Sequence, residues 1–186
     1  QEEFVKWNSF SRVAVAPSRS SGALSVFIDA DASTELASFD LKYMREQDHE
    51  ALLKPGPGLP YALRPGAKVL IIGPGGGWDV ARALAGGSRN VTGVEINPII
   101  ASTVMQQRYA TYTRGLYAAP EVRIVIEEGR SFIRRTREKF QVIQATLVDT
   151  WASTAAGAYA LAENYLYTTN AFRDYLSHLT GDGLLA

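Results

Sequence analysis

The feature that most constrains the fold is a regular alternation of apolar runs and helix-like segments from Lys68 onward. Strand-like runs occupy residues 68–73, 90–96, 122–128 and 140–148, and the first of them is a continuous apolar run, as is typical of a strand covered on both faces. Helical patterns lie between and after them, at residues 78–87, 97–110, 130–139 and 169–179. Residues 183–186 would begin one more strand. Repeated β–α units predict an α/β fold, a Rossmann-like, doubly wound and mostly parallel sheet.

The N-terminal third of the chain has a different pattern. Its strand-like segments are residues 11–16 and 23–30, with a shorter third candidate at 35–39. A helix is predicted over 40–54 with Asp40 as its cap, and the Pro- and Gly-rich residues 55–60 break the chain. We therefore expect two parts. They are residues 1–60, a small antiparallel β element with a connecting helix, and residues 61–186, the Rossmann-like domain.

Composition excludes several classes of function. The 186 residues contain no cysteine, so disulfides, thiolate metal sites and cysteine nucleophiles are excluded. Nineteen basic residues balance nineteen acidic ones, which argues against a nucleic-acid partner. There is no apolar run of about 18 residues, so we expect no membrane contact by this segment, and no signal peptide is visible.

Both ends of the chain suggest a piece of a longer protein. It does not start with Met, and it stops at "GDGLLA", where an apolar run has barely begun. We expect a sheet that is truncated at its C-terminal side. The alternative is a natural short chain with a trimmed Met and a terminal strand.

A glycine-rich loop joins the first strand of the alternation to its helix in "VLIIGPGGGWDVARAL". Its spacing is G-x-G-x-G, formed by Gly73, Gly75 and Gly77. The dinucleotide fingerprint requires a further glycine where Trp78 stands, and Pro74 lacks an amide that could bind phosphate. The loop therefore favours a nucleoside without phosphates.

Acidic residues end the next two strands. Glu95 lies 22 residues after Gly73, where a carboxylate can accept both hydroxyls of a ribose. Glu127 and Glu128 end the following strand, where an adenine edge could lie. The alternatives are a solvated strand end for Glu95 and an exposed charge pair for the other two. Together with the loop they predict a nucleoside cradle.

Five segments resemble the spermidine synthase-like branch of the class I S-adenosylmethionine-dependent methyltransferase superfamily. They are "VLIIGPGGGWDV", "VTGVEINPII", "VRIVIEEGRSFI", "FQVIQATLVDTW" and "AENYLYTTNAFRDYL", and the resemblance covers most of the chain. It implies a small N-terminal β element before the sheet and a role in polyamine biosynthesis. It also implies S-adenosylmethionine or its decarboxylated form as co-substrate, with no metal. The implied cofactor-binding residues are Gly73, Gly75, Gly76, Gly77, Asp79, Glu95, Ile96, Glu128 and Gly129.

Two departures from the family pattern bear on the reaction. Polyamine synthases carry an Asp where Gly76 stands, and Gly76 leaves room for the carboxylate of ordinary S-adenosylmethionine. Asp79 offers a negative charge instead, either to a cationic donor or to the helix dipole. Thr146 stands where the family has the Asp that takes a proton from the amine, and a threonine hydroxyl cannot act as that base near neutral pH.

The acceptor side rests on residues after the fourth strand. Asp149 is the candidate catalytic base or substrate anchor, or else a cap for the segment that follows. The candidate substrate-binding residues are Trp151, Tyr159 and Glu163, for which core packing and a helix-start carboxylate are the alternatives.

Two hypotheses follow. The first is a transferase that moves an aminopropyl or methyl group to a small-molecule acceptor, such as an amine. The second is a non-catalytic domain that keeps the fold for nucleoside binding, assembly or regulation. The resemblance further implies a cytoplasmic domain, a parent protein that is membrane-associated in some relatives, and homodimers, which are frequent in the family.

Overall fold

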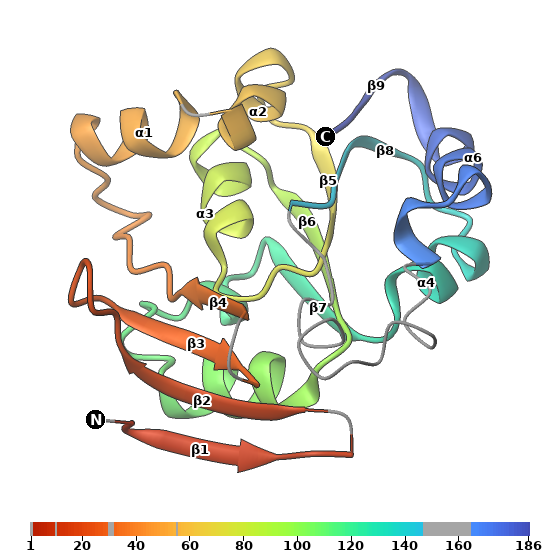
Figure 1. The fold of residues 1–186 in the computed structure, drawn as a ribbon. Coiled ribbons are helices and arrows are strands. Elements are labelled where there is room, and N and C mark those ends of the chain that lie inside the picture. Colours follow the sequence, from red (N-terminus) through yellow and green to blue (C-terminus); the bar gives the residue numbers. More distant parts are fainter. Residues whose placement is uncertain (1, 10, 30–31, 55, 147–164) are drawn as a thin grey trace.

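The computed structural model describes residues 2–9, 11–29, 32–54, 56–146 and 165–186. Its N-terminal part is a four-stranded antiparallel sheet with the strands in chain order (Figure 1). The strands are β1 (Phe4–Trp7), β2 (Arg12–Pro17), β3 (Leu24–Ile28) and β4 (Ala32–Glu35). This confirms the predicted antiparallel element and adds strands to it.

The remainder forms a five-stranded parallel sheet in the order β7-β6-β5-β8-β9 (Figure 1). The strands are β5 (Lys68–Ile72), β6 (Asn90–Glu95), β7 (Val122–Ile126), β8 (Phe140–Gln144) and β9 (Leu179–Leu185). The chain moves outward from β5 to β7 and then returns to the other side of β5. The predicted Rossmann-like α/β fold is therefore confirmed, because such a reversal of strand order defines the doubly wound sheet.

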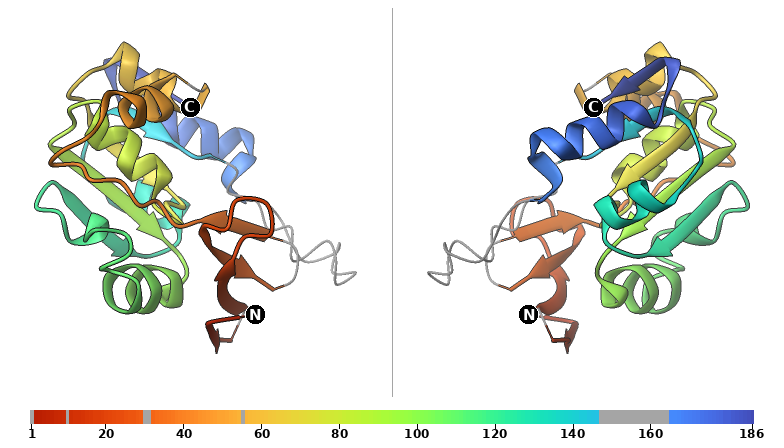
Figure 2. Two further views of the ribbon diagram at one scale, coloured as in Figure 1. Left: turned by 90° about the vertical axis from the view of Figure 1, so that its left-hand side faces the viewer. Right: turned by 90° about the vertical axis from the view of Figure 1, so that its right-hand side faces the viewer.

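Helices cover both faces of the parallel sheet, as the two side views in Figure 2 show. The apolar core on one face includes residues of α3 and η2, and the core on the other face includes residues of α4 and α6. The longer helices are α1 (Glu46–Leu53), α2 (Leu59–Leu63), α3 (Trp78–Ala85), η2 (Ile99–Arg108), α4 (Gly129–Arg135) and α6 (Thr169–Ser177). Short 3-10 turns are η1 (Gly56–Gly58), η3 (Leu116–Ala118) and η4 (Tyr165–Tyr167). None of the helices in the described ranges is both long enough and apolar enough to span a bilayer.

One apolar core joins the two sheets. Val13 and Val26 of the antiparallel sheet belong to the same buried cluster as Val69 and Ile71 of β5 and Val80 of α3. The division of the chain at residue 60 stays a prediction, and the structure adds that core packing crosses that point.

Several element boundaries differ from the sequence expectation. β1 was missed, since most of its residues are exposed and show no alternation. The third expected strand lies earlier, at Ala32–Glu35 rather than 35–39. Asp40 does not cap a helix: its Oδ1 accepts from the Lys42 and Tyr43 amides in a turn, and α1 begins only at Glu46.

η2 is wound more loosely than the expected α-helix. It has π-type hydrogen bonding, and just beyond it the Tyr109 amide donates to the Val104 carbonyl at 2.9 Å. Asn97 caps its start as predicted, because its Oδ1 accepts from the Ile99 amide at 3.0 Å.

Candidate functional site

The glycine loop lies at the carboxyl end of β5, where the strand order reverses between β6 and β8. This is the edge at which ligands bind in open α/β sheets. Gly73, Gly75 and Gly77 have φ angles of 67°, 48° and 90°, a left-handed backbone that residues with a Cβ rarely adopt. The loop conformation therefore depends on the glycines that the sequence pattern singled out.

Two of the loop glycines also allow close packing by the protein itself. A Cβ on Gly77 would lie 2.6 Å from Leu116 Cδ2, and one on Gly76 would lie 2.0 Å from the carbonyl oxygen of Glu35. The Ala37 amide donates to the Gly76 carbonyl at 2.8 Å, which ties the segment after β4 to the loop. The room expected beside Gly76 is thus filled by main chain, and donor contact by Gly76 stays a prediction.

Glu95, the last residue of β6, turns its carboxylate toward this loop. Its Oε2 accepts from the Gly75 amide at 3.1 Å and its Oε1 from the Asn97 amide at 2.9 Å. The residue is 5% exposed, and burial raises the pKa of Glu95, although hydrogen bonds from Asn97, Gly75 and Ile96 oppose the shift. Each carboxylate oxygen has a second lone pair, so Glu95 retains acceptor capacity for a ligand.

Tyr117 is a residue of this site that sequence reasoning missed. It lies in η3, is 3% exposed, and its hydroxyl donates to the Gly75 carbonyl at 2.8 Å. Burial is the main cause that raises the pKa of Tyr117 well above its ordinary value, and the negative charge of Glu95 adds to the shift. No motif or spacing in the sequence marks this tyrosine.

Asn97 connects the site to the antiparallel sheet. Its Nδ2 donates to Ser11 Oγ at 2.9 Å, and its Oδ1 accepts from Asn8 Nδ2 at 3.0 Å. Both partners come from the turn between β1 and β2. A continuous hydrogen-bond chain therefore runs from this turn through Asn97 to Glu95.

Glu128 caps α4. Its Oε1 accepts from the Arg130 amide and its Oε2 from the Ser131 amide, both at 2.8 Å. Glu127 pairs instead with Arg135, with Oε2 and Nη2 2.5 Å apart. The two glutamates therefore have partners within the protein instead of forming the exposed charge pair considered above. Contact of Glu128 with an adenine stays a prediction.

Replacing Glu128 by alanine should lower the free energy of unfolding by about 1 kcal/mol, as is usual for the loss of a helix cap. Denaturant unfolding would measure this. Glu127→Ala is the matched control, because it removes a neighbouring carboxylate that caps nothing, and we expect a clearly smaller loss. Equal losses in the two variants would contradict the capping role.

Two further predicted positions have partners within the protein. Asp79 is 7% exposed and its Oδ1 lies 2.6 Å from Arg82 Nη1, so its charge is neutralised inside α3. Gly129 is buried, and a Cβ there would lie 2.5 Å from Ile72 Cγ2. In contrast, Ile96 remains 56% exposed just beyond β6.

The acceptor half of the prediction is largely outside the described residues. Asp149, Trp151, Tyr159 and Glu163 all fall between 147 and 164. Thr146 is described, and its Oγ1 accepts from Gln144 Nε2 at 2.8 Å. Within the described ranges, no three His, Asp or Glu side chains gather as a metal site would require.

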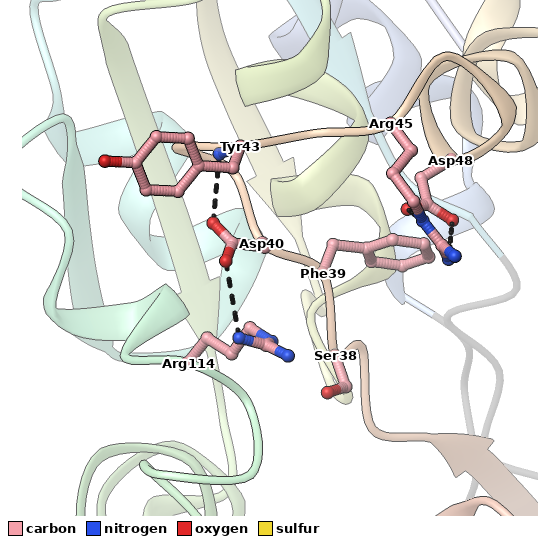
Figure 3. Close-up of a pocket in the computed structure, with 7 residues that line it drawn as sticks. All are labelled: Ser38, Phe39, Asp40, Tyr43, Arg45, Asp48 and Arg114. Atoms are coloured by element: carbon pink, nitrogen blue, oxygen red, sulfur yellow. Dashed lines mark hydrogen bonds and ion pairs between the residues drawn. The ribbon is translucent and has the colours of Figure 1, made fainter.

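A shallow depression of about 430 Å³ lies over the segment between β4 and α1 (Figure 3). Its walls include Phe39 and Tyr43, and its charged groups pair with one another, Asp40 with Arg114 and Arg45 with Asp48. None of the predicted site residues lines it. The glycine loop and Glu95 therefore remain the candidate site.

Comparison with solved structures identifies the fold: the chain shares the Rossmann-like fold of spermidine synthases. A spermidine synthase from Thermotoga maritima superposes with a TM-score of 0.68 at 19% identity, covering 100% of this chain and 56% of that one. A spermidine synthase in complex with the transition state analogue AdoDATO superposes with a TM-score of 0.66 at 18% identity. The superposition covers 100% of this chain and 55% of that one.

Curated relatives give a narrower likeness. A polyamine aminopropyltransferase of Sulfurisphaera tokodaii is 33% identical over 105 residues, which are 54% of this chain and 33% of the relative. A second, from Sulfolobus acidocaldarius, is 29% identical over 136 residues, 73% of this chain and 41% of the relative. No protein-family model matches. The chain thus matches less than half the length of these curated relatives.

Proposed function

We propose that this chain is a spermidine synthase-like transferase domain that binds S-adenosylmethionine or its decarboxylated form. The observation that carries the proposal is the Glu95 carboxylate, held against the glycine loop at the edge where the strand order reverses. The likeness to polyamine aminopropyltransferases also supports a transferase that moves an alkyl group from such a donor.

The geometry favours an adenosine compound without phosphates. The free lone pairs of Glu95 can accept both hydroxyls of a ribose. Pro74 removes one loop amide that a phosphate would need. Ile96 and Ile126 are 56% and 48% exposed at the ends of neighbouring strands, which offers apolar surface to an adenine ring.

The proposed reaction is alkyl transfer from a sulfonium. The acceptor, such as an amine, forms a bond to the carbon beside the sulfur, the carbon–sulfur bond breaks, and a neutral thioether leaves. The amine nitrogen then gives up a proton to a base, a role we assign to Asp149, with Trp151, Tyr159 and Glu163 around the acceptor. Holding the two reactants in line supplies much of the rate enhancement in such reactions.

Thr146 favours a second candidate, a non-catalytic domain that still binds the nucleoside. A carboxylate is absent at this position, and the threonine hydroxyl already accepts a hydrogen bond from Gln144. In this second candidate the domain serves assembly or regulation. Transfer assays with the chain and its Asp149→Asn variant separate the two candidates.

Calorimetry with three ligands tests the proposal: S-adenosylmethionine, its decarboxylated form and methylthioadenosine. We expect saturable binding of at least one of them and no binding of the dinucleotide NAD. A clear preference for the decarboxylated donor supports aminopropyl transfer, and a preference for the carboxylated donor supports methyl transfer. If none of the three binds at millimolar concentration, the proposed function is wrong.

A further inference from the structure

We propose that Tyr117 is a positioning residue for the nucleoside site and that it acts through the main chain of Gly75. The proposal rests on the proposed function. No motif or spacing in the sequence marks this residue.

The two polar groups of Gly75 are held from two sides. Its amide donates to Glu95 Oε2 at 3.1 Å, and its carbonyl accepts from the Tyr117 hydroxyl at 2.8 Å. The residue has a φ of 48°, a conformation that local preference alone does not fix. Two side chains from different elements thus determine how this part of the loop faces the ligand edge.

Tyr117 is buried in the apolar core of the protein. It is 3% exposed, and a Cβ on Gly77 would lie 3.4 Å from its Cε1, so the ring also lies beside the second half of the loop. Because burial and the charge of Glu95 raise the pKa of Tyr117 well above its ordinary value, the hydroxyl stays protonated and remains a donor at physiological pH.

The consequence is preorganisation of the ribose acceptor. Glu95 keeps one oxygen on the Gly75 amide and the other on the Asn97 amide, and its remaining acceptor capacity is available to a ribose hydroxyl. Without the Tyr117 hydroxyl, the Gly75 carbonyl loses its buried donor, and the loop at Gly75, including the amide that donates to Glu95, is less constrained. A site that must be ordered during binding has a lower affinity than a preformed one.

The test compares Tyr117→Phe with Tyr109→Phe. Both remove a single buried hydroxyl, but the Tyr109 hydroxyl has no hydrogen-bond partner among the described residues. By calorimetry, Tyr117→Phe should bind methylthioadenosine about 5- to 10-fold more weakly, the usual effect of one hydrogen bond, and Tyr109→Phe should bind as the parent does. Thermal unfolding establishes that each variant is folded at the temperature of the measurement.

Hydrogen exchange at the Gly75 amide gives a readout without ligand. We expect faster exchange at Gly75 in Tyr117→Phe and parental exchange in Tyr109→Phe. The inference would be overturned if Tyr117→Phe left both nucleoside affinity and exchange at the Gly75 amide unchanged. This holds even if the variant had a lower melting temperature, because a merely structural role would produce that result. If exchange rises but the parent protein binds no nucleoside, loop positioning stands and the proposed function fails.

Discussion

Replacing Glu95 with alanine is expected to weaken methylthioadenosine binding by about a hundredfold or more. Two hydrogen bonds from a ribose to a carboxylate contribute roughly 3 kcal/mol or more together, which corresponds to that factor. The carboxylate is also what holds the Gly75 amide, so the variant loses part of the loop geometry as well. Calorimetry at matched protein concentration would measure the change.

The control for this variant is Glu121→Ala. Glu121 directly precedes β7, at the amino ends of the strands, whereas Glu95 lies at the carboxyl end of β6. Glu121 pairs with Arg89, and its removal should leave nucleoside affinity unchanged. Nucleoside affinity within threefold of the parent in the Glu95 variant would remove the basis of the proposed function.

The pH dependence of the same site gives an independent check. Burial raises the pKa of Glu95 above its unfolded value, so the ionised side chain costs folding free energy, and the contribution of this carboxyl to the stability of the free protein should fall as pH rises through the raised value. Nucleoside affinity should change in the opposite direction, since the ribose hydroxyls donate to the ionised form. It should fall as pH decreases through the pKa of Glu95.

Introducing aspartate at Gly76, the residue that polyamine synthases carry there, is expected to destabilise this protein by about 3 kcal/mol or more. The first added atom would lie 2.0 Å from the Glu35 carbonyl oxygen and 2.9 Å from its carbon. Main chain cannot rotate away as a side chain can, and the new carboxylate would also face a carbonyl oxygen. Denaturant unfolding would measure the loss.

Alanine variants separate the steric cause from the charge. Because the clash begins at Cβ, Gly76→Ala should lose most of the same stability. Gly181→Ala is the matched control, since a Cβ there meets nothing within 4 Å, and the change expected is within about 0.5 kcal/mol. A Gly76→Ala variant as stable as Gly181→Ala would show that the end of β4 does not pack against the loop.

Sequence reasoning reached the fold through periodicity. The apolar run that became β5 is continuous, as a strand buried on both faces requires, and strand-like runs at β6, β7 and β8 alternate with helical segments. Sequence reasoning missed β1, because an exposed edge strand needs no regular pattern of apolar side chains. The start of α1 was wrong because Asp40 forms a turn as readily as a cap.

The candidate site divides in the same way. Glu95 was placed correctly beside the glycines, since the carboxyl ends of neighbouring parallel strands meet at one edge. Glu128 stands at its expected strand end, but its carboxylate turns back to cap α4. The direction of a side chain depends on its nearest hydrogen-bond donors, which the spacing of residues along the chain does not specify.

The sequence by itself determined the parallel sheet, the position of the glycine loop and the acidic residue opposite it. Each of these follows from local pattern and from the order of elements along the chain. Only the tertiary structure decided that Tyr117 holds Gly75, that Asn8 reaches Asn97, and that Glu35 fills the space beside Gly76. These contacts join segments about 40 to 90 residues apart, and they form only when several elements have packed together.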